Sequence, residues 1–286
     1  MSAKQVWRAD GFSWLPGEFD ELLAAFGIDG EVANVFTTVG DTRFYVKLRR
    51  IRRSTCYTRP QRWRWVGFSY RKQEFDNLCF LCDAGVPALQ PAAAAVTYRG
   101  VFLHQELLAT VALEGLRDLR EVLGEVSEER ANVLCARAGA TLAQMHDLGF
   151  VHRDFFPRNL LVRETAGAPE LFVLDCRKGG TNWAPRRNFA YDLGCFDMWS
   201  GVLFPVSARH SFFATYVRDR GLREREGRAL LAKAAKRRQA LVRHRTHTKR
   251  SVHKQFQQWA PAVSLPPVSW DDLAAAPLPD PSGSHG

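Results

Sequence analysis

The segment His152-Arg153-Asp154-Phe155-Phe156-Pro157-Arg158-Asn159 constrains the fold of this chain more than any other stretch. A long helix is predicted before it, because Ser127 suits an N-cap and Gly149 suits the end of a helix. Two short apolar pieces follow it, Leu160–Arg163 and Leu171–Leu174, and both have the composition of strands. The segment is therefore predicted to be a polar loop between a long helix and a pair of strands.

The first third of the chain has the pattern of strands with one helix. Residues 32–39 and 43–48 are separated by the turn signal Gly40-Asp41 and predict a hairpin, and residues 96–98 and 101–106 predict a second one. Between them a helix is predicted from Tyr70 to Ala84, where Gly85 favours termination. From about Tyr191 onward the pattern is helical again.

Strands with one helix, followed mainly by helices, indicate an α+β fold. We expect a β-rich N-terminal lobe with one helix at residues 1–108 and a mainly helical C-terminal lobe at residues 109–260. Residues 261–286 are rich in Pro, Ser and Gly, so we expect a disordered tail there.

Three polar side chains around the loop match the needs of phosphoryl transfer. That reaction requires a cation on the nucleotide phosphates, oxygen ligands for magnesium and a carboxylate that aligns the acceptor hydroxyl. The spacing of Asp154 and Asn159 allows the carboxylate to face an acceptor while the amide oxygen reaches a metal. Asp175 directly follows the predicted strand Leu171–Leu174. The strand would hold this carboxylate rigidly, directed at the same crevice as the side chains of Asp154 and Asn159.

Two charged residues upstream fit the same chemistry. Lys47 lies at the end of a predicted strand, and Glu74 lies in the predicted helix, where it could hold that lysine in an ion pair. Each residue alone could equally be a solvated surface charge. Their order in the chain, before Asp154, Asn159 and Asp175, favours a joint role.

The loop resembles the protein-kinase catalytic loop H-R-D-x-x-x-x-N. Further segments resemble the bacterial lipopolysaccharide kinase family, the Kdo and heptose kinases of the WaaP type, over about residues 30–200. These segments are Phe44-Tyr45-Val46-Lys47, Gln73-Glu74-Phe75-Asp76-Asn77-Leu78, Ala84-Gly85-Val86-Pro87, His152–Val162, Val173-Leu174-Asp175-Cys176-Arg177 and Tyr191-Asp192-Leu193. The resemblance implies a two-lobed protein-kinase-like fold and an ATP-dependent kinase that phosphorylates heptose or Kdo of the lipopolysaccharide inner core, or a related lipid-linked glycan.

The resemblance also implies a role for each matching residue. Lys47 and Glu74 would position ATP, Asp154 would be the catalytic base, and Asn159 and Asp175 would hold Mg²⁺. Asp192 would brace the loop by accepting backbone N–H bonds, and His152 would be structural. The backbone of Gln105-Glu106-Leu107-Leu108 would form the hinge that reads adenine. Arg158, inside the loop, could steady the γ-phosphate or an anionic acceptor.

The chain departs from ordinary protein kinases at two motifs. No G-x-G-x-x-G precedes Lys47, so residues 37–41 are the candidate phosphate-covering turn, and Asp175-Cys176-Arg177 replaces D-F-G. The segment from Gly179 to Pro185 is short and lacks Ala-Pro-Glu. These differences favour a small-molecule or sugar kinase.

The net charge of +10 is concentrated in two blocks without acidic residues. Residues 49–64 contain seven arginines, and residues 228–254 contain ten Lys or Arg. Further cations follow Asp175, where kinases place the acceptor: Arg177, Lys178, Arg186 and Arg187. Such charge suits an anionic glycan or glycolipid acceptor and an anionic inner-membrane surface, although a basic helix can also be a solvated face.

The remaining composition indicates a cytoplasmic protein. The apolar runs are too short to span a bilayer, and Met1–Asp10 has no apolar signal region. Among the six cysteines, only Cys79 and Cys82 form a C-x-x-C pair, so reduced core thiols are expected rather than a zinc site. A cytoplasmic enzyme, peripheral on the inner face of the membrane, is the expectation.

Three other functions remain open. An atypical protein kinase would need an ordered peptide-binding segment. An aminoglycoside-type phosphotransferase would favour H-G-D in the loop and an acidic acceptor pocket. A catalytically dead kinase fold could bind membrane or nucleic acid through its arginines. Nucleic acid is the less favoured partner, because only Trp63 and Trp65 interleave with the basic residues.

Overall fold

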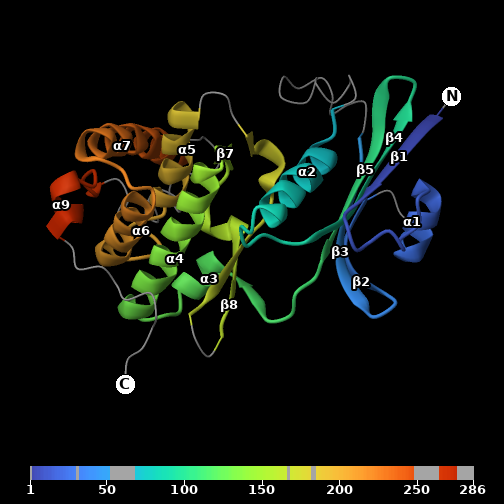
Figure 1. The fold of residues 1–286 in the computed structure, drawn as a ribbon, viewed down its shortest axis with the longest axis horizontal. Helices are drawn as coiled ribbons and strands as arrows, with labels where there is room; N and C mark the ends of the chain where they lie inside the picture. The colour runs from blue at the N-terminus through green and yellow to red at the C-terminus, as the bar shows by residue number, and fades with distance from the viewer. Residues whose placement is uncertain are drawn as a thin grey trace. The chain divides into compact units, whose positions relative to one another are not determined.

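The N-terminal strands assemble into one antiparallel sheet with the order β1-β4-β5-β3-β2 (Figure 1). Its strands are β1 (Ser2–Arg8), β2 (Val32–Val39), β3 (Thr42–Arg50), β4 (Pro91–Arg99) and β5 (Phe102–Val111). Both predicted hairpins are confirmed, β2–β3 and β4–β5, although β4 and β5 are longer than their sequence signals. Strand β1 was not predicted, and it adds to the edge of the sheet beside β4.

The structure is a computed structural model that describes residues 2–29, 32–51, 68–165, 168–181, 185–247 and 264–275. It divides into two units. Unit 1 comprises Met1–Glu114 and Asp175–Lys178, and unit 2 comprises Gly115–Leu174 and Gly179–Gly286. A β-rich N-terminal part is followed by a mainly helical part, which confirms the predicted fold class.

The two helices of unit 1, α1 (Phe19–Ala25) and α2 (Tyr70–Asp83), lie on opposite faces of the sheet (Figure 1). Side chains alternate between the faces of a strand. Phe44, Val46 and Leu48 of β3 accordingly pack in the cluster that contains Phe19 and Leu22 of α1. Lys47, between them, is directed to the face that carries α2.

The boundary between the units differs from the sequence expectation. β5 continues to Val111, and the division falls between Glu114 and Gly115 rather than after residue 108. The hydrophobic pattern of β5 extends through Leu107, Leu108 and Ala109, which are fully buried. The strand therefore ends only where this buried run ends.

Unit 2 combines small β-elements with a helical body. Its strands are β6 (Leu116–Asp118), β8 (Leu160–Arg163) and β9 (Glu170–Val173) in one sheet, and β7 (Phe150–Val151) and β10 (Gly180–Thr181) in another. Its helices are α3 (Leu119–Leu123), α4 (Glu128–Asp147), α5 (Pro185–Asp197), α6 (Val206–Asp219), α7 (Glu224–His247) and α9 (Trp270–Ala275). Ser127 caps α4 by accepting the backbone N–H of Arg130, as its sequence position predicted.

Helices α4 and α6 pack closely at Gly139. A Cβ atom at this position would overlap the carbonyl oxygen of Phe212, so only glycine allows this approach. Nearby, the buried side chain of Arg209 donates from Nε (2.6 Å) and Nη2 (2.9 Å) to the carboxylate of Asp197. The helical body therefore has a close-packed contact at Gly139 and a buried ion pair between Arg209 and Asp197.

The predicted disordered tail, residues 261–286, is partly ordered. Residues 264–275 contain helix α9, Leu273 and Val268 are buried, and the carbonyl of Pro266 accepts Nη1 of Arg209 (2.7 Å). The Pro and Ser content of this segment predicted disorder, but the buried side chains of Val268 and Leu273 anchor residues 264–275 in unit 2. Residues 276–286 lie outside the described residues, and within the described chain no helix is both long and apolar enough to cross a membrane.

Candidate active site

In unit 1 the predicted pair of Lys47 and Glu74 is in direct contact. Lys47 Nζ lies 2.9 Å from Glu74 Oε1, and Arg71 Nη1 lies 2.7 Å from Glu74 Oε2. Burial alone would raise the pKa of Glu74, but the two cations outweigh this effect and hold its pKa below the ordinary value. Glu74 is therefore an ionised, buried anchor that fixes the position of the lysine.

Glu106 has a different position from the one predicted. Its buried carboxylate accepts bonds from Ser69 Oγ (3.0 Å) and from the backbone N–H of Arg71 (3.4 Å) at the N-terminus of α2. A negative charge at this end of a helix is stabilised by the helix dipole. Glu106 therefore holds the start of the helix that carries Glu74.

The predicted hinge at Gln105–Leu108 is wrong. These residues are in the interior of β5 and pair with β3 on one side and β4 on the other. Their backbone groups are used in the two ladders, so they are not free to read a base. The segment that leaves the sheet is residues 112–115, after the backbone N–H of Ala112 has bonded to Arg43.

Asp175 directly precedes a short 3₁₀ turn, Cys176–Lys178, that packs on α2. Asn77 of α2 donates its Nδ2 to the carbonyl of Cys176 (2.7 Å), and Cys176 is fully buried. Asp175 has a positive φ of 57°, and its Oδ1 lies 3.3 Å from Arg177 Nε. This unusual backbone is typical of a functional position, because the surrounding contacts must hold it in place.

In unit 2 the loop after β7 is held by Asp192 of α5. The two carboxylate oxygens accept the backbone N–H groups of His152 and Arg153, each at 2.7 Å. Arg153 has a φ of 62°, and in the described chain it shares a positive φ only with Asp175 among non-glycine residues. The Asp192 carboxylate thus compensates for a strained backbone directly before Asp154.

His152 connects this loop to Leu174, the residue directly after β9. Its Nδ1 accepts the backbone N–H of Asp154 (3.2 Å), so its Nε2 carries the proton and donates to the carbonyl of Leu174 (3.0 Å). The ring is fully buried. His152 is therefore a structural residue in geometry, because both nitrogens are used in backbone contacts.

Asp154, Arg158 and Asn159 lie together on the same loop. The side chains of Asp154 and Asn159 are nearly buried. Asn159 Nδ2 donates to the carbonyl of Asp154 (2.7 Å), which leaves the amide oxygen as the atom of that side chain suited to a cation. Arg158 Nη2 lies 3.5 Å from Asp154 Oδ1, and its guanidinium lies over the ring of Phe156. The loop thus offers a carboxylate, an amide oxygen and a cation.

Sequence reasoning missed a buried pair behind Asp192. His146 Nε2 lies 3.3 Å from Asp192 Oδ2, and His146 Nδ1 lies 2.7 Å from the hydroxyl of Tyr216 on α6. Both side chains are almost fully buried. The sequence did contain one signal for this pair, because His146 lies on the buried stripe of the long helix predicted before the loop. The sequence contained no such signal for Tyr216, because its partner His146 is 70 residues away in the chain.

The buried His146 predicts a loss of stability in mild acid. Burial lowers its pKa more than Asp192 raises it, so the pKa of the folded state lies below the value of 6.5 for the unfolded chain. As the pH falls below 6.5 the unfolded state binds this proton first, and the free energy of unfolding decreases. Denaturant unfolding at pH 7.5 and 5.5 should show that His146→Gln removes about 1 kcal/mol of this decrease. Equal pH dependence in both proteins would contradict the assignment.

Several predicted features lie outside the described residues. They include most of the first basic block with Trp63 and Trp65, residues 182–184, and residues 248–254. The side chains of Arg186 and Arg187 are likewise not described. Among the described residues no group of three or more His, Cys, Asp or Glu side chains could hold a metal ion alone.

The sheet with an ion-paired lysine, followed by a helical unit with an Asp154–Asn159 loop, defines a phosphotransferase of protein-kinase-like fold. A family model agrees with this class. The lipopolysaccharide kinase (Kdo/WaaP) family model matches residues 30–198. The chain belongs to this family, and it is a kinase of lipopolysaccharide biosynthesis that transfers phosphate to a hydroxyl group.

Solved structures support the fold. A structure of WaaP in complex with acyl carrier protein is 19% identical, covers 83% of this chain and 99% of its own, and has a TM-score of 0.61. A glucosamine kinase (crystal form B) is 14% identical over 91% of this chain and 78% of its own, with a TM-score of 0.57. The same comparison includes glucosamine kinase in complex with glucosamine, ADP and inorganic phosphate, with a TM-score of 0.56. A search of curated proteins gave no match.

Proposed function

We propose that this kinase transfers the γ-phosphate of ATP to a hydroxyl of heptose or Kdo in the lipopolysaccharide inner core, or of a related lipid-linked glycan. The observation that carries the proposal is the loop of Asp154 and Asn159, which Asp192 holds through two backbone N–H groups. This arrangement holds the loop that carries a nearly buried carboxylate and an amide oxygen before any substrate binds. Such preorganisation is the main protein contribution to phosphoryl transfer.

Asp154 would align the acceptor hydroxyl and accept its proton. Its carboxylate is rigid because the loop backbone on its N-terminal side is held by Asp192 and His152. Arg158, close to Asp154 Oδ1, would contact the transferred phosphate or an anionic group of the acceptor. A fixed carboxylate and a partly exposed guanidinium suit an acceptor that is both hydroxylated and anionic.

The oxygen chemistry of two side chains suits a magnesium ion. Asn159 Oδ1 and the Asp175 carboxylate are hard oxygen ligands, and Mg²⁺ commonly binds one or two such side chains together with phosphate oxygens. When bound, the ion would neutralise charge on the phosphates. Asp175 lies 3.3 Å from Arg177 Nε, so this arginine balances the charge of the carboxylate in the protein alone.

Lys47 would contact the nucleotide phosphates, with Glu74 and Arg71 fixing its position. Since β5 uses the backbone of Glu106, Leu107 and Leu108 in its ladders, residues 112–115 are the better candidates for reading adenine. This replaces the hinge predicted from sequence.

Nucleotide binding can be measured without an acceptor. Saturating Mg-ATP should raise the melting temperature by about 5 °C or more, and a chelator should remove most of that gain. Asp175→Asn should reduce the gain in the presence of magnesium, whereas Asp271→Asn, an exposed control, should keep it. A melting temperature that does not respond to Mg-ATP would contradict nucleotide use.

The identity of the acceptor can be determined by measuring phosphate transfer from labelled ATP. Lipopolysaccharide core lacking inner-core phosphate, free heptose, free Kdo and a generic protein mixture should be offered in parallel. We expect label in the lipopolysaccharide core and little in protein. Label that enters only protein would contradict the sugar acceptor and favour an atypical protein kinase.

An anionic surface is the proposed partner of helix α7. Its exposed Arg225, Lys236 and Arg243 fall on one helical stripe, while Leu231 and Val242 face the interior. Each such cation near an anionic membrane contributes about 1 kcal/mol. The WaaP neighbour was solved with acyl carrier protein, so a protein partner is the second candidate. Sedimentation with anionic vesicles, compared with pull-down by acyl carrier protein, separates the two.

A further inference from the structure

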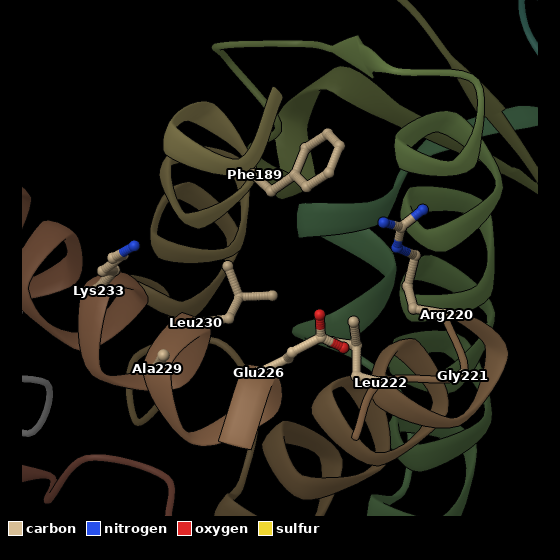
Figure 2. A pocket seen from close by; sticks show the side chains of 8 residues that line it. All are labelled: Phe189, Arg220, Gly221, Leu222, Glu226, Ala229, Leu230 and Lys233. Atoms are coloured by element: carbon tan, nitrogen blue, oxygen red, sulfur yellow. The ribbon is translucent and has the colours of Figure 1, made fainter. Parts of the chain in front are cut away.

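A cavity of about 340 Å³ lies within unit 2, apart from the residues assigned to phosphate transfer. Figure 2 shows it between α5, the end of α6 and the first turns of α7. Its volume is at the small end of the range of ligand pockets, roughly 300 to 1,000 Å³. The side chains that matter for a ligand are those of Phe189, Arg220, Leu222, Glu226, Leu230 and Lys233.

The cavity has apolar walls, and both positively and negatively charged side chains line it. Phe189 is buried, and Leu222 and Leu230 are partly buried, whereas Glu226 and Lys233 are exposed at its rim. Figure 2 shows the Arg220 guanidinium and the Glu226 carboxylate reaching toward the space between the apolar side chains. A ligand would therefore contact hydrocarbon with its body and charged groups at its ends.

Arg220 brings a cation to the wall of the cavity. Its guanidinium forms an ion pair with Asp147 through Nη1 and lies 5.0 Å from the centre of the Phe189 ring. The Arg220 side chain lines the cavity and is 16% exposed, so an anion there would meet the accessible part of the guanidinium, and hydrogen bonds from a charged donor are stronger than neutral ones.

The wall of the cavity is connected to the catalytic loop. The Phe189 ring stacks on the His146 ring, with centroids 4.1 Å apart and planes 19° apart. His146 contacts Asp192, the carboxylate that accepts the backbone N–H groups of His152 and Arg153. A molecule that restrains Phe189 therefore restrains the side chains that hold the loop.

We propose that this cavity binds a small hydroxylated organic anion and that the bound molecule stabilises the loop before Asp154. The anionic oxygen accepts a hydrogen bond from the Arg220 guanidinium, with Lys233 as a second cation at the rim. A hydroxyl of the ligand donates to the Glu226 carboxylate, and the apolar body lies against Phe189, Leu222 and Leu230. The cavity is separate from the residues proposed to bind the acceptor. The test of this proposal is therefore independent of the proposed sugar substrate.

The test uses 4-hydroxybenzoate as the anionic probe and 4-hydroxybenzyl alcohol as its neutral counterpart. Calorimetry on the full chain should show binding of the anion, and binding of the alcohol should be about tenfold to a hundredfold weaker because the charge-assisted bond is lost. Leu230→Trp should fill the cavity and reduce the affinity at least tenfold. Gln239→Trp, exposed on the same helix and outside the cavity, should bind as the wild type does.

Hydrogen exchange tests the connection to the loop. The amides of His152 and Arg153 should exchange more slowly with the anionic probe in the wild type and in Gln239→Trp, but not in Leu230→Trp. Failure of the wild type to bind the anion at millimolar concentration would overturn the proposal, as would equal binding of both probes or undiminished binding by Leu230→Trp. Binding without any change of exchange would overturn the connection to the loop. The comparison of the two probes in the wild type needs no variant, so it holds even if Leu230→Trp does not fold.

Discussion

Asp154→Asn should lower the rate of phosphate transfer by about 10² to 10⁴-fold while the protein stays folded. The amide has nearly the shape of the carboxylate but cannot accept the proton of the acceptor hydroxyl. The contacts that hold the loop involve the backbone of Asp154, which donates to His152 and accepts from Asn159, so they survive the substitution. The measurement is kcat with lipopolysaccharide core and ATP, together with the melting temperature.

The matched control for this variant is Asp219→Asn. Asp219 is an acidic residue of the same unit whose carboxylate pairs with Arg218 at the exposed end of α6. It should change neither kcat nor the melting temperature appreciably. Activity of Asp154→Asn close to that of Asp219→Asn would remove Asp154 from its proposed role.

Asp192→Ala should lower the free energy of unfolding by about 2 to 5 kcal/mol and abolish most of the activity. The substitution leaves the backbone N–H groups of His152 and Arg153 without their acceptor, and it removes a partner of His146. Because Arg153 has a positive φ, the loop would relax once these bonds are lost. Denaturant unfolding and kcat measured on the same preparation check both effects.

The activity loss of Asp192→Ala can be separated from simple unfolding. Arg209→Met breaks a buried ion pair of the same unit with Asp197, and it should cost about 3 to 5 kcal/mol. At a temperature where both variants are folded, Arg209→Met should retain a kcat near that of the wild type. If both variants lose activity in proportion to stability, Asp192 has only a structural role.

Local patterns were sufficient for most of the secondary structure. Helix α2 covers Tyr70–Asp83 and α4 covers Glu128–Asp147, close to the predicted ranges, because caps and apolar spacing are local signals. The tail was mispredicted, since the burial of Val268 and Leu273 depends on the surface that they meet. The hinge was mispredicted because the end of β5 depends on its two neighbouring strands.

By itself the sequence determined the α+β class, and it predicted a set of residues for phosphoryl transfer: Lys47, Glu74, Asp154, Asn159 and Asp175. These are readable because spacing along a strand, helix or loop is a local property. Only the tertiary structure decided what holds them: Glu106 at the start of α2, Asn77 on the carbonyl of Cys176, and His146 with Tyr216 behind Asp192. Those partners are distant in the chain, and only folding brings such groups within hydrogen-bond distance, where a buried polar group must find its partner.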